Sequence, residues 1–456
     1  MPELSAELLS KYNETRFARD KSLLCFAPFK NIYFNVIGQG AACWLTFFEA
    51  PKYPEYSVRD IWFGDYFKQL RNNIKNADLS DRCRVCENNI QNQLFMNPLA
   101  RAYDTDSPVR DYPSIMELEL SNRCNLACTM CNGRLSSSIR KTRDGLPPLE
   151  SPYDTEFANQ LEEFIPHLDE LRFNGGEPFL QDICWQTWER VVSLKNTILT
   201  TIATNGTVWS DRVENMLKRG NFRINLSLDG MTAKTYESIR INSKFDRVME
   251  NIKKFSGYCA DRGTLFSIMI NPMRANWQEM PLFVEFCNSN GYHLAFNTVY
   301  RPFQRALWTL PSEDLFAIQK ELSKVEFRQR PSMREDIFYG NVKKFENLVN
   351  NQILTWAIEQ KEREALRTDY SFQKRSRQNA GEQLFQKIKA KSFDENLFSK
   401  FENKLQFLED RVKRNVEPDD FYYQLSQLPL DWLVHDLSNK SAEQMIEEIY
   451  YRSEYY

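Results

Sequence analysis

Three cysteines stand close together in the middle of the chain and are the residues best able to do chemistry. Cys124, Cys128 and Cys131 lie within the stretch from Ser121 to Arg134, which reads SNRCNLACTMCNGR. Thiols at this spacing are either ligands of a metal or cluster, or unrelated core thiols. A closed metal site usually takes four protein ligands, and this stretch supplies three. The spacing thus raises the question of where a fourth ligand would come from.

Six strand-like runs, separated by helix-like segments, would position these cysteines. The runs cover residues 114–121, 170–175, 197–204, 222–229, 264–271 and 292–299. Alternation of strands and helices predicts a parallel sheet with right-handed crossovers, either an open sheet or a partial barrel. The cysteines would lie on the loop that leaves the first of these strands. In both architectures functional residues collect at the carboxyl ends of the strands.

The carboxyl ends of the next three predicted strands carry residues suited to binding a small molecule. The second strand ends in Gly175-Gly176-Glu177-Pro178, the third in Thr204-Asn205-Gly206 and the fourth in Ser227-Leu228-Asp229. Adjacent glycines expose backbone groups, a carboxylate accepts from an ammonium group, and a Ser-x-Asp pair can hold ribose hydroxyls. Each motif alone is typical of an ordinary turn. Their order after the three cysteines favours a binding site.

With these motifs the chain resembles the radical S-adenosylmethionine (SAM) superfamily. The resemblance rests on the CxxxCxxC motif, on GGEP (175–178), TNG (204–206) and SLDG (227–230), and on TYESIR (235–240); it covers residues 113 to 305. It implies an α/β fold with a partial (β/α)6 TIM-like barrel. It also implies that the three cysteines bind a [4Fe-4S] cluster whose fourth iron is coordinated by SAM.

The resemblance assigns SAM contacts to further residues. Gly175, Gly176 and Glu177 would contact the methionine part, Ser227 and Asp229 the ribose, and Asn205 and Met130 would complete the site. Met130 stands where the family commonly has an aromatic residue that packs on adenine, and its polarizable sulfur can serve the same purpose. In this family SAM is cleaved reductively to a 5′-deoxyadenosyl radical, which abstracts a hydrogen atom from the substrate.

Four further cysteines form a second set near the amino terminus. Cys25 precedes a predicted hairpin that turns at residues 38–40, Cys43 lies on its return strand, and a helix-like segment (57–76) leads to Cys83 and Cys86. Spacing alone allows a zinc site, an iron-sulfur cluster or core thiols.

This second set resembles the twitch domain, the shorter form of the SPASM domain, which carries auxiliary [4Fe-4S] clusters in radical SAM enzymes. The resemblance implies one auxiliary [4Fe-4S] cluster on Cys25, Cys43, Cys83 and Cys86. In the family such domains typically follow the core, whereas this one precedes it. A cluster with four protein ligands favours electron transfer over binding of substrate.

Composition and charge argue against some classes of binding partner. The chain has 456 residues and a formal net charge of −3, so it presents no global field for nucleic acid or anionic membranes. Its first residues lack the apolar run of a secretory signal, and no run of 18 apolar residues occurs. We expect a cytoplasmic protein with no nucleic-acid or membrane partner.

The length predicts more than one domain. We divide the chain into an auxiliary cluster domain (1–110), a radical SAM core (111–310) and a mainly helical carboxyl-terminal region (311–456), which is rich in charged residues at helical spacing. Cys184, Cys259 and Cys287 lie in helix-like segments and are expected to be core thiols.

The expected function is that of a radical SAM oxidoreductase or maturase that oxidises or crosslinks a ribosomally made peptide. Its partners would be that peptide and an electron donor such as flavodoxin or ferredoxin. One alternative is a dehydrogenase or other modifier of a small molecule, such as a sugar or cofactor precursor. Another is a non-catalytic iron-sulfur protein.

Overall fold

The computed structural model describes most of the chain. The described residues are 4–18, 20–79, 82–95, 98–300, 302, 304–367, 380–391 and 395–412, together with 422, 425, 433, 434 and 437. They divide into two compact units, which are described separately. The first comprises residues 1–297 and 326–345, and the second comprises 298–325 and 346–456.

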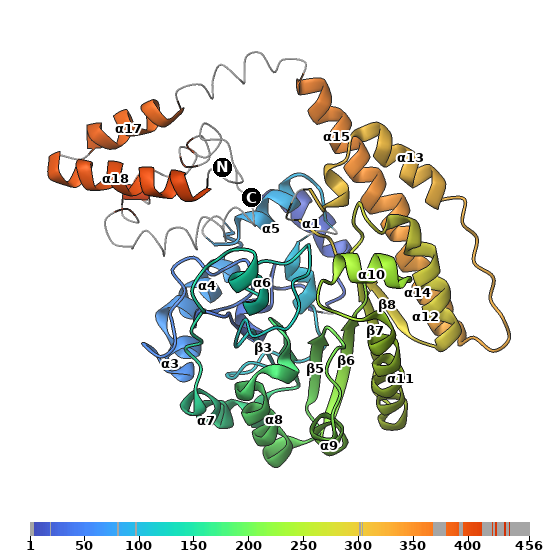
Figure 1. Ribbon diagram of the computed structural model, residues 1–456. Coiled ribbons are helices and arrows are strands. Elements are labelled where there is room, and N and C mark those ends of the chain that lie inside the picture. The colour runs from blue at the N-terminus through green and yellow to red at the C-terminus, as the bar shows by residue number, and fades with distance from the viewer. Residues whose placement is uncertain are drawn as a thin grey trace. The chain divides into compact units, whose positions relative to one another are not determined.

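The first unit is built on one eight-stranded sheet (Figure 1), with the order β2-β1-β3-β4-β5-β6-β7-β8. Its strands are β1 (Asn31–Phe34), β2 (Gly40–Ala41), β3 (Ile115–Leu118), β4 (Glu170–Phe173), β5 (Leu199–Thr204), β6 (Asn221–Ser227), β7 (Phe266–Ile270) and β8 (His293–Phe296). All neighbouring pairs are parallel except β1 and β2, which are antiparallel. Strands β3 to β8 follow chain order, so the predicted partial (β/α)6 barrel is confirmed.

Helices connect successive strands of the barrel. They are α6 (Ser137–Thr142), α7 (Thr155–Phe164), α8 (Asp182–Lys195), α9 (Asp211–Arg219), α10 (Ala233–Ile239), α11 (Phe245–Arg262) and α12 (Met280–Asn290), and α14 (Glu335–Asn347) follows β8 at a distance in the chain. Short 3-10 turns η2 (Ile165–His167), η3 (Pro178–Leu180) and η4 (Trp277–Glu279) join them. In Figure 1 the helices α8, α9 and α11 lie outside the strands.

The two faces of the sheet differ in polarity. Leu118, Phe173, Ile202 and Ile224 are aligned across four neighbouring strands and are fully buried. Phe173 packs edge to face on Trp188 of α8, so this face forms the core beneath the helices. The neighbouring row on the opposite face is polar and contains Glu117, Arg172, Thr201 and Arg223. The polar row therefore faces the concave side of the barrel.

The amino-terminal segment extends the barrel sheet. The predicted hairpin is present as β1 and β2, and β1 pairs in parallel with β3 over its whole length. Cys43 lies two residues beyond β2 and not within the return strand. The other elements of this segment are α1 (Ala6–Glu14), α2 (Ala27–Lys30), α3 (Val58–Phe63), α4 (Asp65–Lys75), α5 (Arg84–Gln91) and η1 (Leu99–Tyr103).

The helix predicted for residues 57–76 is divided in two. Gly64 has extended backbone angles between α3 and α4, and a Cβ atom there would lie 2.3 Å from the carbonyl oxygen of Asp60. Glycine therefore allows the break.

The second unit is helical in its described residues. It contains η5 (Leu307–Thr309), α13 (Ser312–Leu322), the π-helical turn η6 (Leu348–Ile353), α15 (Leu354–Arg367), α17 (Ala380–Lys391) and α18 (Glu395–Val412). Helices α13 and α15 pack together, and Ser312 donates to Glu364 through its backbone N–H at 2.9 Å. The division at residues 110 and 310 stays a prediction.

No described helix is long and apolar enough to cross a membrane.

Candidate functional site

The three central cysteines lie on the loop that follows β3 at its carboxyl end. This cysteine loop (residues 119–136) pairs with the end of α10, because Ala127 N–H donates to Ile241 O at 3.0 Å and Thr129 N–H to Ile239 O at 2.9 Å. Ser136 Oγ donates to Leu126 O at 2.6 Å and closes the loop from within. The thiols are therefore presented by a fixed backbone at the edge where parallel sheets bind ligands.

A buried ion pair fixes the segment on which the cysteine loop rests. Arg240 Nη2 lies 2.6 Å from Asp229 Oδ2, with side-chain exposures of 6% and 0%. The pair joins the end of β6 to α10, so the SLDG and TYESIR motifs meet in space. The sequence motif contained Arg240, but its role was missed because only the fold brings it to Asp229.

Arg240 also acts on the cysteine thiols. Burial raises the pKa of Cys128 to about 11, and the positive charge of Arg240 opposes this shift. Burial likewise raises the pKa of Cys124, against the Leu126 N–H, the Asn205 amide and Arg240. A cation and hydrogen-bond donors at these sulfur atoms favour thiolates, the form that binds metal. The donor set therefore fits a thiolate-ligated cluster.

The glycine pair forms a turn that packs against the cysteine loop. Gly175 and Gly176 have φ values of +74° and +52°. A Cβ atom on Gly176 would lie 2.6 Å from Arg123 O and 2.9 Å from Ser121 O. Gln181 Nε2 donates to Gly175 O at 2.9 Å and to Ser121 O at 3.1 Å, which holds the two segments together.

Glu177 is fully buried beneath this turn, and its carboxylate is held mainly by protein donors. It accepts from Asn205 N–H at 2.7 Å, from the Thr204 hydroxyl at 2.8 Å and from Phe179 N–H at 3.3 Å. Burial raises its pKa to about 7 in spite of these donors. A carboxylate has about four acceptor positions, and these bonds occupy three of them.

Asn205 reaches the cysteine loop directly. Its Nδ2 donates to Asn125 Oδ1 at 3.0 Å and lies 3.8 Å from Cys124 Sγ. The TNG motif therefore contacts the thiol site, and the contact was not apparent from the sequence.

The two residues predicted to contact ribose, Ser227 and Asp229, differ in whether their side chains already have protein partners. Asp229 uses all four acceptor positions, because Arg240 bonds Oδ2 twice and Asn271 bonds Oδ1 through its backbone N–H and side-chain amide. Ser227 ends β6 and is half-buried, as is Met130 on the cysteine loop. The ribose contact of Asp229 stays a prediction, and its contacts in the structure indicate a positioning role.

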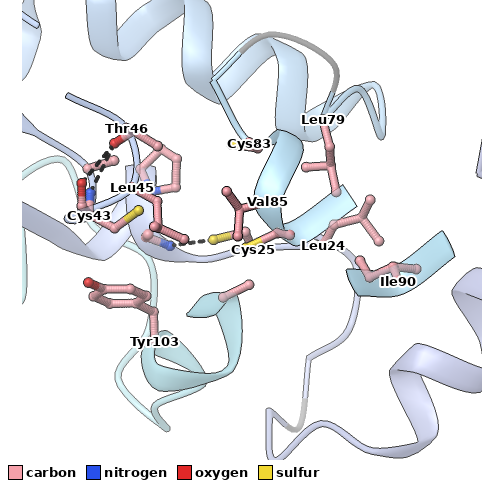
Figure 2. Close-up of a pocket in the computed structure, with 15 residues that line it drawn as sticks. Leu24, Cys25, Cys43, Leu45, Thr46, Leu79, Cys83, Val85, Ile90 and Tyr103 are labelled. Atoms are coloured by element: carbon pink, nitrogen blue, oxygen red, sulfur yellow. Dashed lines mark hydrogen bonds between the residues drawn. The ribbon is translucent and has the colours of Figure 1, made fainter. Parts of the chain in front are cut away.

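The structure also brings the four amino-terminal cysteines together. Cys25, Cys43, Cys83 and Cys86 line one pocket, shown in Figure 2. The remaining lining is largely apolar and includes Leu24, Leu79, Val85, Ile90 and Tyr103. We call this the four-cysteine pocket. Cys83 precedes α5 and Cys86 lies within it, while Cys25 lies just before α2.

The thiols of the four-cysteine pocket influence one another. Burial raises the pKa of Cys25 well above its ordinary value, and Cys83, Cys43 and Cys86 raise it further. Burial raises the pKa of Cys43 to about 12, with Cys86 adding to the shift. Ala27 N–H donates to Cys25 Sγ at 3.4 Å. Backbone N–H groups also face the sulfurs of Cys43 and Cys86 and favour their thiolates. Four thiols that line one pocket, with N–H donors at three of them, provide the type of ligands that a fully ligated cluster needs.

The two cysteine sites lie at opposite ends of β3. Continuing the β1–β2 register places Cys43 beside Asn31, the first residue of β1, which pairs with Ile115 at the start of β3. The cysteine loop leaves the other end of the same strand. The four residues of β3 span roughly 10 Å.

A polar contact chain joins the four-cysteine pocket to the concave face of the barrel. Tyr103, which lines the pocket, donates through its hydroxyl to Glu117 Oε1 at 2.7 Å. Glu117 Oε2 lies 3.8 Å from Arg172 Nη1, and Arg172 bonds Glu170 at 2.9 Å. Tyr103 and Glu117 were missed because no sequence motif marks them.

Within the described ranges, no group of three or more His, Cys, Asp or Glu side chains is placed to hold a single metal ion. Cys184, Cys259 and Cys287 are buried in α8, α11 and α12.

Part of the chain matches the model of a known family. Residues 118–287 match the model of the radical SAM superfamily. A probable GTP 3′,8-cyclase of Methanocella arvoryzae is 28% identical over 142 residues, which cover 30% of this chain and 42% of the relative. A probable GTP 3′,8-cyclase of Methanocaldococcus jannaschii is 26% identical over 183 residues, covering 39% of this chain and 55% of the relative. The chain thus spans about half the length of these curated relatives.

Solved structures matched in the comparison include "Native anSMEcpe with bound AdoMet", which is 18% identical, with the match covering 46% of this chain and 59% of that chain and a TM-score of 0.37. Another is SuiB of Streptococcus suis bound to S-adenosylmethionine, 16% identical, covering 58% of this chain and 59% of that chain, with a TM-score of 0.36.

Replacing Gly176 with alanine tests the packing of the glycine turn on the cysteine loop. We expect Gly176→Ala to lower the free energy of unfolding by about 2 kcal/mol or more, because positive φ and contact with two carbonyl oxygens both oppose a side chain. Gly145→Ala is the matched control, since Gly145 has a φ of +64° and open space around it. Urea unfolding measures both; equal losses would contradict close packing.

The buried carboxyl group of Glu177 predicts a pH-dependent stability. Its folded-state pKa of about 7 lies above the ordinary 4.5, so its contribution to stability is complete below 4.5 and is lost as the pH rises through 7. The stability of Glu177→Gln relative to wild type should therefore rise between pH 5 and pH 8, by on the order of 2 kcal/mol. Glu237→Gln, at an exposed carboxylate, should show a level difference over this range. A level difference for Glu177→Gln would refute the raised pKa.

Proposed function

The chain contains a radical SAM domain, and from that premise we propose that it is an enzyme that cleaves SAM reductively and oxidises its substrate with the help of an auxiliary cluster. The observation that carries the proposal is the pairing of a three-thiol loop at the carboxyl end of β3 with the four-cysteine pocket at the other end. A cluster on the three thiols of the cysteine loop would have one coordination position open for SAM, whereas a cluster in the four-cysteine pocket would have four protein ligands.

When bound, the cluster and SAM supply a 5′-deoxyadenosyl radical that abstracts a hydrogen atom from the substrate. The protein's own contribution is orientation and electrostatics. Arg240 places a positive charge near Cys128, which Asp229 partly offsets, and Asn205 fixes the loop beside Cys124. We propose that the backbone of Gly175 and Gly176, the remaining acceptor position of Glu177 and the hydroxyl of Ser227 bind SAM, with Met130 beside its adenine.

We further propose that Cys25, Cys43, Cys83 and Cys86 hold an auxiliary [4Fe-4S] cluster. Burial and the neighbouring thiols raise the pKa of Cys25, so iron would bind with release of thiol protons, and its positive charge would offset the repulsion among the thiolates. A fully ligated cluster would accept the second electron when the substrate radical is oxidised.

A ribosomally made peptide is the first proposed substrate, modified by oxidation or crosslinking. A small molecule is the second candidate, because the curated relatives are named GTP 3′,8-cyclases. Incubating the reduced protein and SAM with GTP, and separately with a precursor peptide encoded beside its gene, distinguishes the two by mass spectrometry of the products. A ferredoxin or flavodoxin is the proposed electron donor.

Cleavage of SAM tests the enzymatic proposal. With dithionite and SAM, the anaerobically reconstituted protein should release 5′-deoxyadenosine, measured by chromatography. Cys124→Ala should abolish release, because it removes a ligand of the open site. The matched Cys83→Ala variant should retain release and block oxidation of the product. Absence of release from the wild type would contradict an enzymatic role.

Iron content tests the auxiliary cluster. Reconstitution should give about eight irons per chain in the wild type, and about four when either cysteine set is replaced by alanine. Iron and zinc are measured by mass spectrometry of the metals. About four irons with one zinc in the wild type would overturn the auxiliary cluster in favour of a zinc site.

A further inference from the structure

One buried hydroxyl group beside the four-cysteine pocket is without a hydrogen-bond partner among the described residues. Tyr12 of α1 is 0% exposed, and its hydroxyl oxygen accepts and donates no bond there. Buried polar groups in native proteins are almost always paired, since an unpaired group loses its bonds to water without compensation. Among the described residues, this hydroxyl is therefore available to donate to a bound group.

The surroundings of Tyr12 place it at the four-cysteine pocket. Tyr12 belongs to a buried cluster with Leu24, Leu79 and Ile90, which line the pocket, and Cys25 and Cys83 pack against the same cluster. Helix α1 also packs against α5, which carries Cys86. Burial raises the pKa of Tyr12; Arg16 opposes this, and Cys25 and Cys86 add to it. Two of the four thiols are thus near the hydroxyl.

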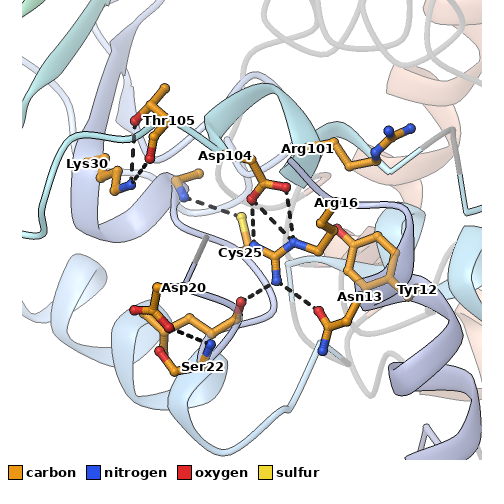
Figure 3. Close-up of polar contacts among 12 residues, drawn as sticks. Tyr12, Asn13, Arg16, Asp20, Ser22, Cys25, Lys30, Arg101, Asp104 and Thr105 are labelled. Atoms are coloured by element: carbon orange, nitrogen blue, oxygen red, sulfur yellow. Dashed lines mark hydrogen bonds and ion pairs between the residues drawn. The ribbon is translucent and has the colours of Figure 1, made fainter. Parts of the chain in front are cut away.

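The guanidinium group of the nearby Arg16 is not the hydrogen-bond donor for the pocket, because it already bonds to other protein atoms. Arg16 is paired with Asp104 at 2.6 Å, with both side chains 0% exposed. Its Nη1 also donates to Leu23 O at 2.5 Å and to Asn13 Oδ1 at 3.2 Å. Figure 3 shows this arrangement, with Tyr12 and Cys25 close by. The ion pair adds no net charge, and Tyr12 remains the available donor.

We propose that the Tyr12 hydroxyl donates a hydrogen bond to a sulfur atom of the cluster held by Cys25, Cys43, Cys83 and Cys86, and thereby raises its reduction potential. The proposal rests on the auxiliary cluster proposed above. Sulfur atoms of a cluster carry more negative charge when it is reduced, so a donor stabilises the reduced form. Tyr12 thus makes the closed site a better electron acceptor.

The test uses Tyr12→Phe, which keeps the ring and removes only the hydroxyl. It is introduced into the full chain carrying C124A/C128A/C131A, so that the auxiliary cluster alone gives the electron paramagnetic resonance signal. At a fixed potential near the midpoint of the parent, the ratio of reduced to oxidised cluster should fall by about threefold to tenfold. Iron content should stay unchanged.

Tyr153→Phe is the matched control, because Tyr153 is also buried and its hydroxyl donates to Asn35 O at 2.5 Å within the protein. It should lower the melting temperature of the iron-free chain and leave the reduced fraction unchanged. Tyr12→Phe should leave the melting temperature of the iron-free chain unchanged or higher, since no protein bond is lost.

Different outcomes contradict the role of Tyr12 and the presence of the auxiliary cluster. A bound cluster whose reduced fraction is unaffected by Tyr12→Phe, or equally affected by Tyr153→Phe, overturns the role of Tyr12 alone. Failure of the C124A/C128A/C131A chain to bind iron overturns both the auxiliary cluster and the role of Tyr12.

Discussion

The buried ion pair between Asp229 and Arg240 is the interaction on which the central thiol site depends. Removing one partner of such a pair is costly because it leaves an unpaired buried charge. The pair ties the end of β6 to the end of α10, whose carbonyl groups receive the backbone of the cysteine loop. The same guanidinium group lowers the cost of ionising Cys128. One interaction thus fixes the position of the loop and places a cation near one of its thiols.

The parallel pairing of β1 with β3 is the second constraint, and it arranges the two thiol sites. It makes the amino-terminal segment part of the barrel sheet, and it places Cys43 at the amino end of the strand whose carboxyl end leads to Cys124. The concave polar face, with Glu117 and Arg172, lies along the strands between these ends. This arrangement supports the proposal of radical formation at one end and electron acceptance at the other.

The strands of the barrel and the glycine turn could be predicted because their signals are local. Each of the six predicted runs overlaps a strand, although the observed strands are shorter and β6 begins one residue before its run. The run 114–121 contains β3 at Ile115–Leu118, and its last residues enter the cysteine loop. The break at Gly64 was missed because a single glycine within a helical pattern is usually tolerated. The hydrogen-bond partners of Asp229 and Glu117, and the apolar side chains around Tyr12, come from other segments of the chain, and no spacing rule connects them.

The central claim is that the three-thiol site binds SAM through an open position and that the four-cysteine pocket is closed. Pulsed electron-nuclear double resonance on the reduced protein, with SAM labelled with nitrogen-15 at its amino group, tests it most directly. We expect coupling between the cluster and the labelled nitrogen in the wild type and in the chain that lacks Cys25, Cys43, Cys83 and Cys86. We expect no nitrogen coupling when Cys124, Cys128 and Cys131 are replaced, although the signal of the auxiliary cluster should persist. Nitrogen coupling that persists without Cys124, Cys128 and Cys131 would contradict the binding of SAM at the three-thiol site.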